Sequence, residues 1–202
     1  ANLCERAQKK PVREGLLIGP GGLCDYVIVN TGYLFKIPDT LSYEEASLTE
    51  PLACVVHSVT KANIQLGEDV VVIGGGIMGQ YHVMLAKRRG ARVIMSEVDE
   101  NRRALARKLG ADITFNPMEK DPVEYVKSLT EGRGADVVFN TTAIPSVVPQ
   151  AIAMTGKAGR MIQYSSMHPD APAPVSPQML HGNEPILTGS ISPDVHDFFT
   201  AN

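Results

Sequence analysis

The sequence predicts an α/β fold in which a parallel sheet is covered by helices on both faces. Six short apolar segments, most of them rich in β-branched residues, recur along the chain at 70–73, 92–95, 113–115, 137–139, 160–164 and 186–190. Segments of helical length separate the first five, at 78–89, 100–109, 122–129 and 146–155. Apolar strands that alternate with amphipathic helices are typical of a parallel sheet buried on both faces.

Smaller features support this order of elements. A Gly-Ala-Asp tripeptide precedes two of the strands, at 110–112 and 134–136, as expected of successive β-α units. The last connection differs from the others, because the proline-rich segment 169–178 (PDAPAPVSPQ) is unsuited to a regular helix. We therefore expect a substantial loop before the sixth strand.

The first part of the chain has a different character. It is rich in Gly and Pro, with an alternating apolar segment at 23–29 and a short predicted strand at 35–38, which indicates β structure and loops. Ser42 and Glu45 then form a capping box at a helix start. A second helix is expected to begin at Glu50 and Pro51, because proline suits a first helical turn, and to continue to about Ala62.

Composition narrows the class of protein. The 202 residues, 44% of them hydrophobic, suffice for one domain of ordinary size, or one domain and part of another. A net charge of −3 with scattered basic residues argues against nucleic acid or an anionic membrane as partner. No apolar run approaches the roughly 20 residues of a membrane span. The three distant cysteines, Cys4, Cys24 and Cys54, predict no disulfide framework and favour a reducing, cytoplasmic setting.

Residues 69–80, DVVVIGGGIMGQ, carry the clearest functional motif. The pattern G-x-G-x-x-G follows a predicted strand directly and opens a helix, which is the context of a Rossmann dinucleotide-binding loop. Gly74 would make the tight turn, Gly76 would let a diphosphate approach the backbone, and Gly79 would let the helix pack on the strand. The free N–H groups of the helix start, at Ile77 and Met78, would face the phosphates.

Glu97 ends the second strand, 18 residues after Gly79. A carboxylate there can accept hydrogen bonds from both hydroxyls of an adenine ribose and would repel a 2′-phosphate, which predicts NAD rather than NADP. The alternative is a plain strand-to-helix turn beside a solvated glutamate. Arg102, on the first turn of the next helix, either covers the adenine face or is a solvated helix residue.

Several further segments match those of one protein family in order and spacing. They are ANLCE (1–5), GGLCDYVIV (21–29), 34–46, EPLACVVH (50–57), KLGAD (108–112), GRGADVVF (132–139) and AGRMI (158–162). With the glycine loop, they make nearly the whole chain resemble zinc-dependent medium-chain alcohol dehydrogenases, closest to the polyol (sorbitol-type) dehydrogenases. The resemblance implies an internal fragment. Residues 1–49 would be a remnant of the β-rich GroES-like catalytic domain, 50–192 the NAD-binding Rossmann domain, and 193–202 the start of the return to the catalytic domain.

The resemblance also implies a reaction. Members of the family transfer hydride from a secondary alcohol or polyol to the nicotinamide of NAD, with zinc acting as a Lewis acid. Glu50 would send its carboxylate toward the catalytic zinc, and Cys4 would be the last ligand of a structural zinc lobe. The other ligands are missing, so we expect zinc in the intact protein only, and a fragment that is inactive alone. Glu50 has a second interpretation, an acidic residue favoured by the helix dipole.

The nicotinamide half of the cofactor is assigned by the same resemblance. The residues implied to contact it are Ala143, Tyr164, Ser166, Ser190 and Ile191. Cys54 would line the site, one helical turn from Glu50. Polyol dehydrogenases usually have an aromatic residue and an arginine where Ile191 and Ser192 stand here, which leaves a different polyol or secondary alcohol open as substrate.

Other functions compete with the dehydrogenase. One is a zinc-free medium-chain reductase, against which the acidic Glu50 argues. Another is a non-catalytic NAD-binding module, and a third is a methyltransferase, whose sheet ends in an antiparallel hairpin. The resemblance also implies a homodimer, with a tetramer possible, in which the last strand pairs edge to edge with that of a second copy. The apolar, uncharged segment 186–192 fits this expectation, because an exposed apolar edge strand invites aggregation.

Overall fold

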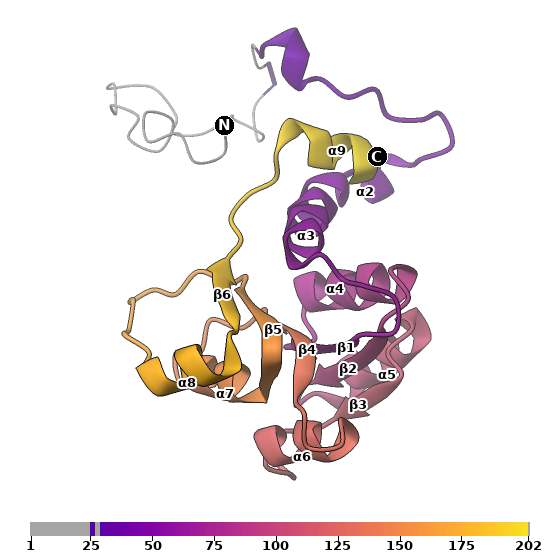
Figure 1. Ribbon diagram of the computed structural model, residues 1–202. Coiled ribbons are helices and arrows are strands. Elements are labelled where there is room, and N and C mark those ends of the chain that lie inside the picture. The colour runs from indigo at the N-terminus through magenta and orange to yellow at the C-terminus, as the bar shows by residue number, and fades with distance from the viewer. Residues whose placement is uncertain (1–24, 27–28, 202) are drawn as a thin grey trace.

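The computed structural model describes residues 25–26 and 29–201 and contains one sheet of six parallel strands. The strand order is β3-β2-β1-β4-β5-β6 (Figure 1). The strands are β1 (Asp69–Ile73), β2 (Arg92–Ser96), β3 (Ile113–Phe115), β4 (Ala135–Asn140), β5 (Thr155–Gln163) and β6 (Ile186–Gly189). The order reverses between β1 and β4, so the predicted doubly wound Rossmann fold is confirmed. The described strands include no antiparallel pair, which disfavours the methyltransferase alternative.

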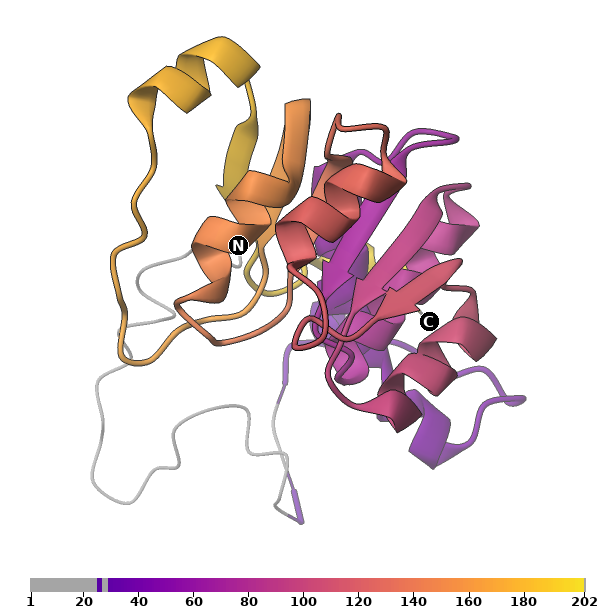
Figure 2. The same ribbon diagram turned by 90° about the horizontal axis from the view of Figure 1, so that it is seen from below.

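Helices cover both faces of the sheet. On one face lie α3 (Thr49–Ala62), α4 (Ile77–Arg88) and α5 (Glu100–Leu109), and on the other α6 (Pro122–Leu129) and α7 (Val147–Met154). Figure 2 shows α6 and α7 side by side against the sheet. No helix in the described part of the chain is long and apolar enough to cross a membrane.

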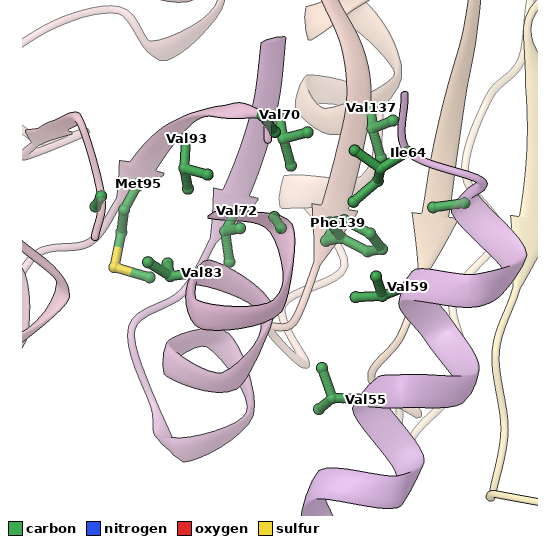
Figure 3. Close-up of a cluster of buried hydrophobic side chains, with 14 of the residues drawn as sticks. Val55, Val59, Ile64, Val70, Val72, Val83, Val93, Met95, Val137 and Phe139 are labelled. Carbon is green, nitrogen blue, oxygen red and sulfur yellow. The ribbon is translucent and has the colours of Figure 1, made fainter. Parts of the chain in front are cut away.

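The alternation of side chains along β1 explains why its sequence is apolar throughout. Val70 and Val72 point into the core beneath α3 and α4 (Figure 3), whereas Val71 and Ile73 point into the core beneath α6 and α7. Phe139, on the adjacent β4, is fully buried in the first of these cores. Burial on both faces therefore requires a continuous β-branched run rather than a polar alternation.

Local hydrogen bonds account for several helix boundaries. The predicted capping box is present: the backbone N–H of Glu45 donates to Ser42 Oγ at 3.2 Å, and that of Ser42 donates to Glu45 Oε2 at 2.9 Å. It begins α2 (Tyr43–Ala46). Asp99 caps α5 by accepting from the N–H of Arg102, and Asp121 caps α6 in the same way. Such short polar residues satisfy N–H groups that a first helical turn leaves without partners.

The predicted strand at 35–38 is wrong, since these residues have no regular structure. A strand requires a neighbouring backbone to pair with, and the described part of the chain supplies none here. Instead, the ring of Phe35 stacks 5.0 Å from that of Phe198, on α9 (Val195–Ala201). The described elements before α3 are η1 (Thr31–Tyr33) and α2. The predicted apolar segment 23–29 lies mostly outside the described residues.

The last connection also corrects the prediction. The chain has no helix between β5 and Ser176, as its prolines suggested, but α8 (Pro177–Asn183) then begins within the segment 169–178. Ser176 caps this helix by accepting from the N–H of Met179, and Pro177 occupies its first turn. A proline there removes an N–H that has no helical partner, so it starts a helix instead of preventing one.

Candidate functional site

The glycine loop between β1 and α4 has the geometry of a sharp turn under a helix. Gly74 has a φ of +95°, a conformation that favours glycine. At Gly79, a Cβ atom would lie 1.9 Å from the carbonyl oxygen of Gly74, so only glycine allows α4 to come this close to β1. At Gly76, a Cβ atom would meet nothing within 4 Å. The loop is therefore tightly packed on its inner side and open at Gly76.

The start of α4 offers backbone donors to this open side. Gly76 is the N-cap residue, and no side chain caps the helix. The first N–H groups of an uncapped helix lack acceptors and carry the positive end of the helix dipole. The side chain of Ile77 is exposed, and that of Met78 packs against the core, so the groups that these two residues direct to the open side of the loop are their backbone N–H groups.

Glu97 faces the glycine loop. Its side chain is only 5% exposed; Oε2 accepts from the N–H of Gly75, and Oε1 accepts from the N–H of Asp99 at 2.9 Å. The guanidinium of Arg102 is 3.9 Å from Oε2 and mostly exposed. The carboxylate of Glu97 is thus hydrogen-bonded to the glycine loop, and the exposed guanidinium of Arg102 lies beside it.

Two cavities open at the carboxyl edge of the sheet. The first, of about 370 Å³, brings Gly74 and Gly76 together with Glu97 and Arg102, and its far wall includes Thr141 and Thr142 at the end of β4. The second, of about 440 Å³, is lined by Cys54, Ala143, Tyr164, Ser165, Ser166, Ser190, Ile191 and Ser192. All five residues assigned to the nicotinamide half are among them. The two cavities adjoin, because Thr142 lines the first and the next residue, Ala143, lines the second. We call the two cavities together the cleft.

The cleft lies where the strand order reverses. In open α/β sheets, ligands bind beyond the carboxyl ends of the strands at this point. The fit to a dinucleotide rests on the open face at Gly76, on the uncapped start of α4 and on the buried carboxylate of Glu97. These features match a diphosphate between two nucleoside pockets.

Electrostatics at the second cavity keep its thiol protonated. Cys54 Sγ donates to Glu50 Oε1 at 3.3 Å. Burial, followed by this hydrogen bond and the charge of Glu50, raises the pKa of Cys54 to about 12. Burial also raises the pKa of Tyr164 above its ordinary value. Cys54 therefore lines the cavity as a neutral thiol, since a nucleophilic cysteine requires a lowered pKa.

Two residues that the sequence analysis did not select hold the cleft together. Gln80 Nε2 donates to the carbonyl oxygens of Gly75, at 2.9 Å, and Arg102, at 3.0 Å. Asn140 donates to Gln163 Oε1 at 2.9 Å and accepts from the N–H and the hydroxyl of Thr142. Both are buried polar residues on apolar elements. That placement is a signal which sequence inspection could have used.

A zinc site is not complete in the described part of the chain. No three His, Cys, Asp or Glu side chains gather there as metal ligands, and Glu50 is a single exposed carboxylate in the first turn of α3. One carboxylate does not make a tetrahedral site. Cys4, the predicted structural ligand, lies outside the described residues. The ring of His57 is hydrogen-bonded to a different residue, with Nδ1 lying 2.9 Å from Asp197 Oδ2.

Comparison with known proteins identifies the family. A family model described as zinc-binding dehydrogenase matches residues 78–202, which is more than half of the chain. The chain belongs to the zinc-binding dehydrogenase family. It is 36% identical over 166 residues to D-arabitol-phosphate dehydrogenase of Enterococcus avium, covering 80% of this chain and 46% of that protein. It is 33% identical over 142 residues to sorbitol dehydrogenase of Bacillus subtilis, covering 70% and 40% respectively.

Solved structures agree with this assignment. The 2R,3R-butanediol dehydrogenase of Bacillus subtilis superimposes with a TM-score of 0.74 and 32% identity, over 83% of this chain and 47% of that one. A zinc-binding dehydrogenase of Sinorhizobium meliloti, bound to NADP, gives a TM-score of 0.79 with 29% identity, over 83% and 50%. This member of the family thus spans about half the length of the relatives it matches.

One buried histidine supports the floor of the cleft. His82 Nδ1 is 2.8 Å from the carbonyl oxygen of Met78, Nε2 is 3.0 Å from Ser58 Oγ, and the ring packs between Phe139 and Tyr164. Burial lowers the pKa of His82 to about 4. The imidazole is therefore neutral at pH 7, donating to the carbonyl and accepting from the hydroxyl.

This histidine predicts a loss of stability in acid. An unfolded histidine takes up a proton near pH 6.5, whereas His82 in the native state does so only near pH 4. The free energy of unfolding should therefore fall by about 3 kcal/mol as the pH drops from 6.5 to 4, with no contribution from His82 above 6.5. Urea denaturation across this range, compared with His82→Gln, measures the effect. Parallel pH profiles of the two proteins would contradict it.

Proposed function

We propose that the chain is the cofactor-binding part of an NAD-dependent, zinc-assisted alcohol or polyol dehydrogenase. The observation that carries the proposal is the joint placement of the open Gly76, the uncapped start of α4 and the buried Glu97 around one cavity. When bound, the dinucleotide would supply the hydride acceptor. The protein's part is to hold it along the cleft, with the adenosine beside Glu97 and the nicotinamide beside Tyr164.

The preference for NAD over NADP rests on the carboxylate of Glu97. Its oxygens already accept from two backbone N–H groups, so the side chain is held in place before a ribose arrives. Ribose hydroxyls can donate to the remaining lone pairs, but a 2′-phosphate would bring negative charge against a buried carboxylate. A solved relative carries NADP, which indicates that the choice depends on such local residues and not on the fold.

For the substrate, we propose a small secondary alcohol or polyol. Similar proteins include sorbitol, butanediol and D-arabitol-phosphate dehydrogenases. The second cavity has four serines, Tyr164 and Ile191 on its walls, a mixture that suits a hydroxylated ligand. Glu50 would complete a zinc site with ligands from outside the described residues. The zinc content of the longer protein, with and without Glu50→Ala, tests that role.

We also propose a homodimer formed through β6. This strand is the outer edge of the sheet, and Ile186 at its start is 56% exposed. An uncovered apolar edge invites pairing with another strand, and an identical strand from a second copy can satisfy its backbone groups. Sedimentation equilibrium should give the mass of two chains, and the mass of one chain would contradict the pairing.

The two ends of the glycine motif should respond differently to a methyl group. Gly76→Ala places its Cβ in open space, so the free energy of unfolding should change by no more than about 1 kcal/mol. The methyl group would occupy the approach of the diphosphate and weaken NAD binding at least about tenfold. Gly79→Ala collides with the carbonyl oxygen of Gly74 and should cost about 1–3 kcal/mol or more in stability.

Urea denaturation and calorimetric titration with NAD measure both effects. Wild-type affinity in a folded Gly76→Ala protein would show that the diphosphate does not cross the loop there.

Replacing Glu97 tests the ribose contact. Glu97→Ala removes charge-assisted hydrogen bonds worth about 1.5–3 kcal/mol, so NAD affinity should fall about 10- to 100-fold. Glu97→Gln preserves the shape of the side chain and removes its charge, and it should narrow the difference in affinity between NAD and NADP. Glu119→Ala, an exposed acid outside the cleft, is the control. Unchanged affinity in both Glu97 variants would count against the assignment.

A further inference from the structure

A third cavity lies at the amino edge of the sheet, opposite the cleft. Its volume is about 450 Å³, and its walls come from α6, α7, α8, the start of β5, and the loops that precede β4 and α8. It shares no lining residue with the cleft. The proposed dehydrogenase function makes no use of it.

Positive charge dominates the walls of this cavity. Lys127, Arg133 and Lys157 line it, and no carboxylate does. Lys127 Nζ has one acidic neighbour, at 3.6 Å, on its own helix. Arg133 donates to Asp69 Oδ2 at 3.4 Å, a long hydrogen bond, and Arg92 donates to the other oxygen of that carboxylate, Oδ1, at 2.5 Å. No described residue forms an ion pair with Lys157.

Two acidic residues beside this cavity reduce its positive charge without cancelling it. Glu131 and Asp136 line an adjoining cavity that also includes Arg133 and Lys157. Asp136 accepts from the backbone N–H of Asp69 at 2.8 Å, so part of its charge is directed inward. A ligand with two negative charges, concentrated in one group, would gain most from three cations at such a wall.

Hydrogen-bond donors are also in surplus at the third cavity. Ser176 Oγ accepts from the N–H of Met179, which leaves its own proton available. The side-chain amide of Asn183 has no hydrogen-bond partner among the described residues. With three cations and two polar donors but no acidic acceptor on its walls, the cavity is complementary to a ligand rich in acceptor oxygens.

The remaining wall is apolar, with Pro149, Ile152 and Met179 among its residues. An inorganic ion would leave this wall exposed to water, whereas a carbon skeleton would cover it. The volume falls within the range of small-molecule sites. The cavity therefore suits an organic anion of moderate size more than a free ion.

An irregularity in β5 places Lys157 at the cavity. Thr155 pairs with Ala135 and Arg160 with Val137, so β5 contains extra residues between the two pairs. Within this bulge Ala158 has a φ of +55°, a conformation that side chains disfavour. Strand bulges redirect side chains, and strained residues persist where the surrounding structure requires them. The bulge thus presents an unpaired lysine to the ligand.

We propose that this third cavity binds a small phosphate monoester of the sugar-phosphate type. Its phosphate would lie among Lys127, Arg133 and Lys157, with Ser176 and Asn183 donating to the remaining oxygens. The carbon skeleton would lie against Ile152 and its apolar neighbours. A dianionic phosphate satisfies three cations through short, charge-assisted hydrogen bonds.

Calorimetric titration with glucose 6-phosphate, in low salt and without dinucleotide, tests this site. We expect saturable binding of glucose 6-phosphate, weaker binding of inorganic phosphate and none of glucose. Lys157→Gln should weaken glucose 6-phosphate binding at least tenfold. Lys108→Gln removes the same charge from an exposed position on α5 and should change the affinity less than twofold. Lys127→Gln, a second variant of the same cavity, should also weaken glucose 6-phosphate binding. Thermal melting of each variant tests whether that variant is folded.

The variants also separate this site from the cleft. A sugar phosphate that binds only in the cleft would keep its affinity in Lys157→Gln and Lys127→Gln, and that result would overturn the proposal. Absence of saturable binding to the wild type, or equal weakening by Lys108→Gln, would overturn it as well. None of these outcomes depends on whether the chain binds NAD, because the titrations contain no dinucleotide.

Discussion

The close approach of α4 to the end of β1 is the contact on which the rest of the molecule depends. Without a side chain at Gly79, the helix lies against the carbonyl oxygen of Gly74, and its first turn sits directly above the sheet. The same approach buries Val83 against the β-branched residues of β1. One steric constraint therefore serves both the core and the site, because it positions uncapped N–H groups at the edge where the strand order reverses.

Polar side chains then connect this contact to the neighbouring strands. Gly75 donates its N–H to Glu97, and its carbonyl oxygen accepts from Gln80. Thr141 donates to the carbonyl oxygen of Ile73. Buried polar groups are stable only when such hydrogen bonds are made, so each of these residues holds the others in place. The cleft is consequently rigid at its centre. Arg102 in the first cavity and Ile191 in the second have exposed side chains.

The two edges of the sheet carry different chemistry. At the carboxyl edge, the cleft combines backbone donors with a buried carboxylate and suits a dinucleotide. At the amino edge, three cations and free donors surround a separate cavity. Parallel strands produce this division, because every strand presents its carboxyl end to one side and its amino end to the other.

Local patterns along the chain were enough to predict the sheet, the central helices and the glycine motif, because hydrophobic period, helix caps and glycine spacing depend on sequence neighbours. The sequence also predicted that Glu97 and the residues assigned by resemblance to the nicotinamide follow strand ends, and the structure places them there, whereas their contacts with a cofactor stay a prediction. The same patterns did not predict that residues 35–38 form no strand, that Gln80 and Asn140 form hydrogen bonds around the cleft, or that Lys157 lines a cavity with two other cations. These outcomes depend on contacts between segments far apart in sequence, which local patterns do not encode.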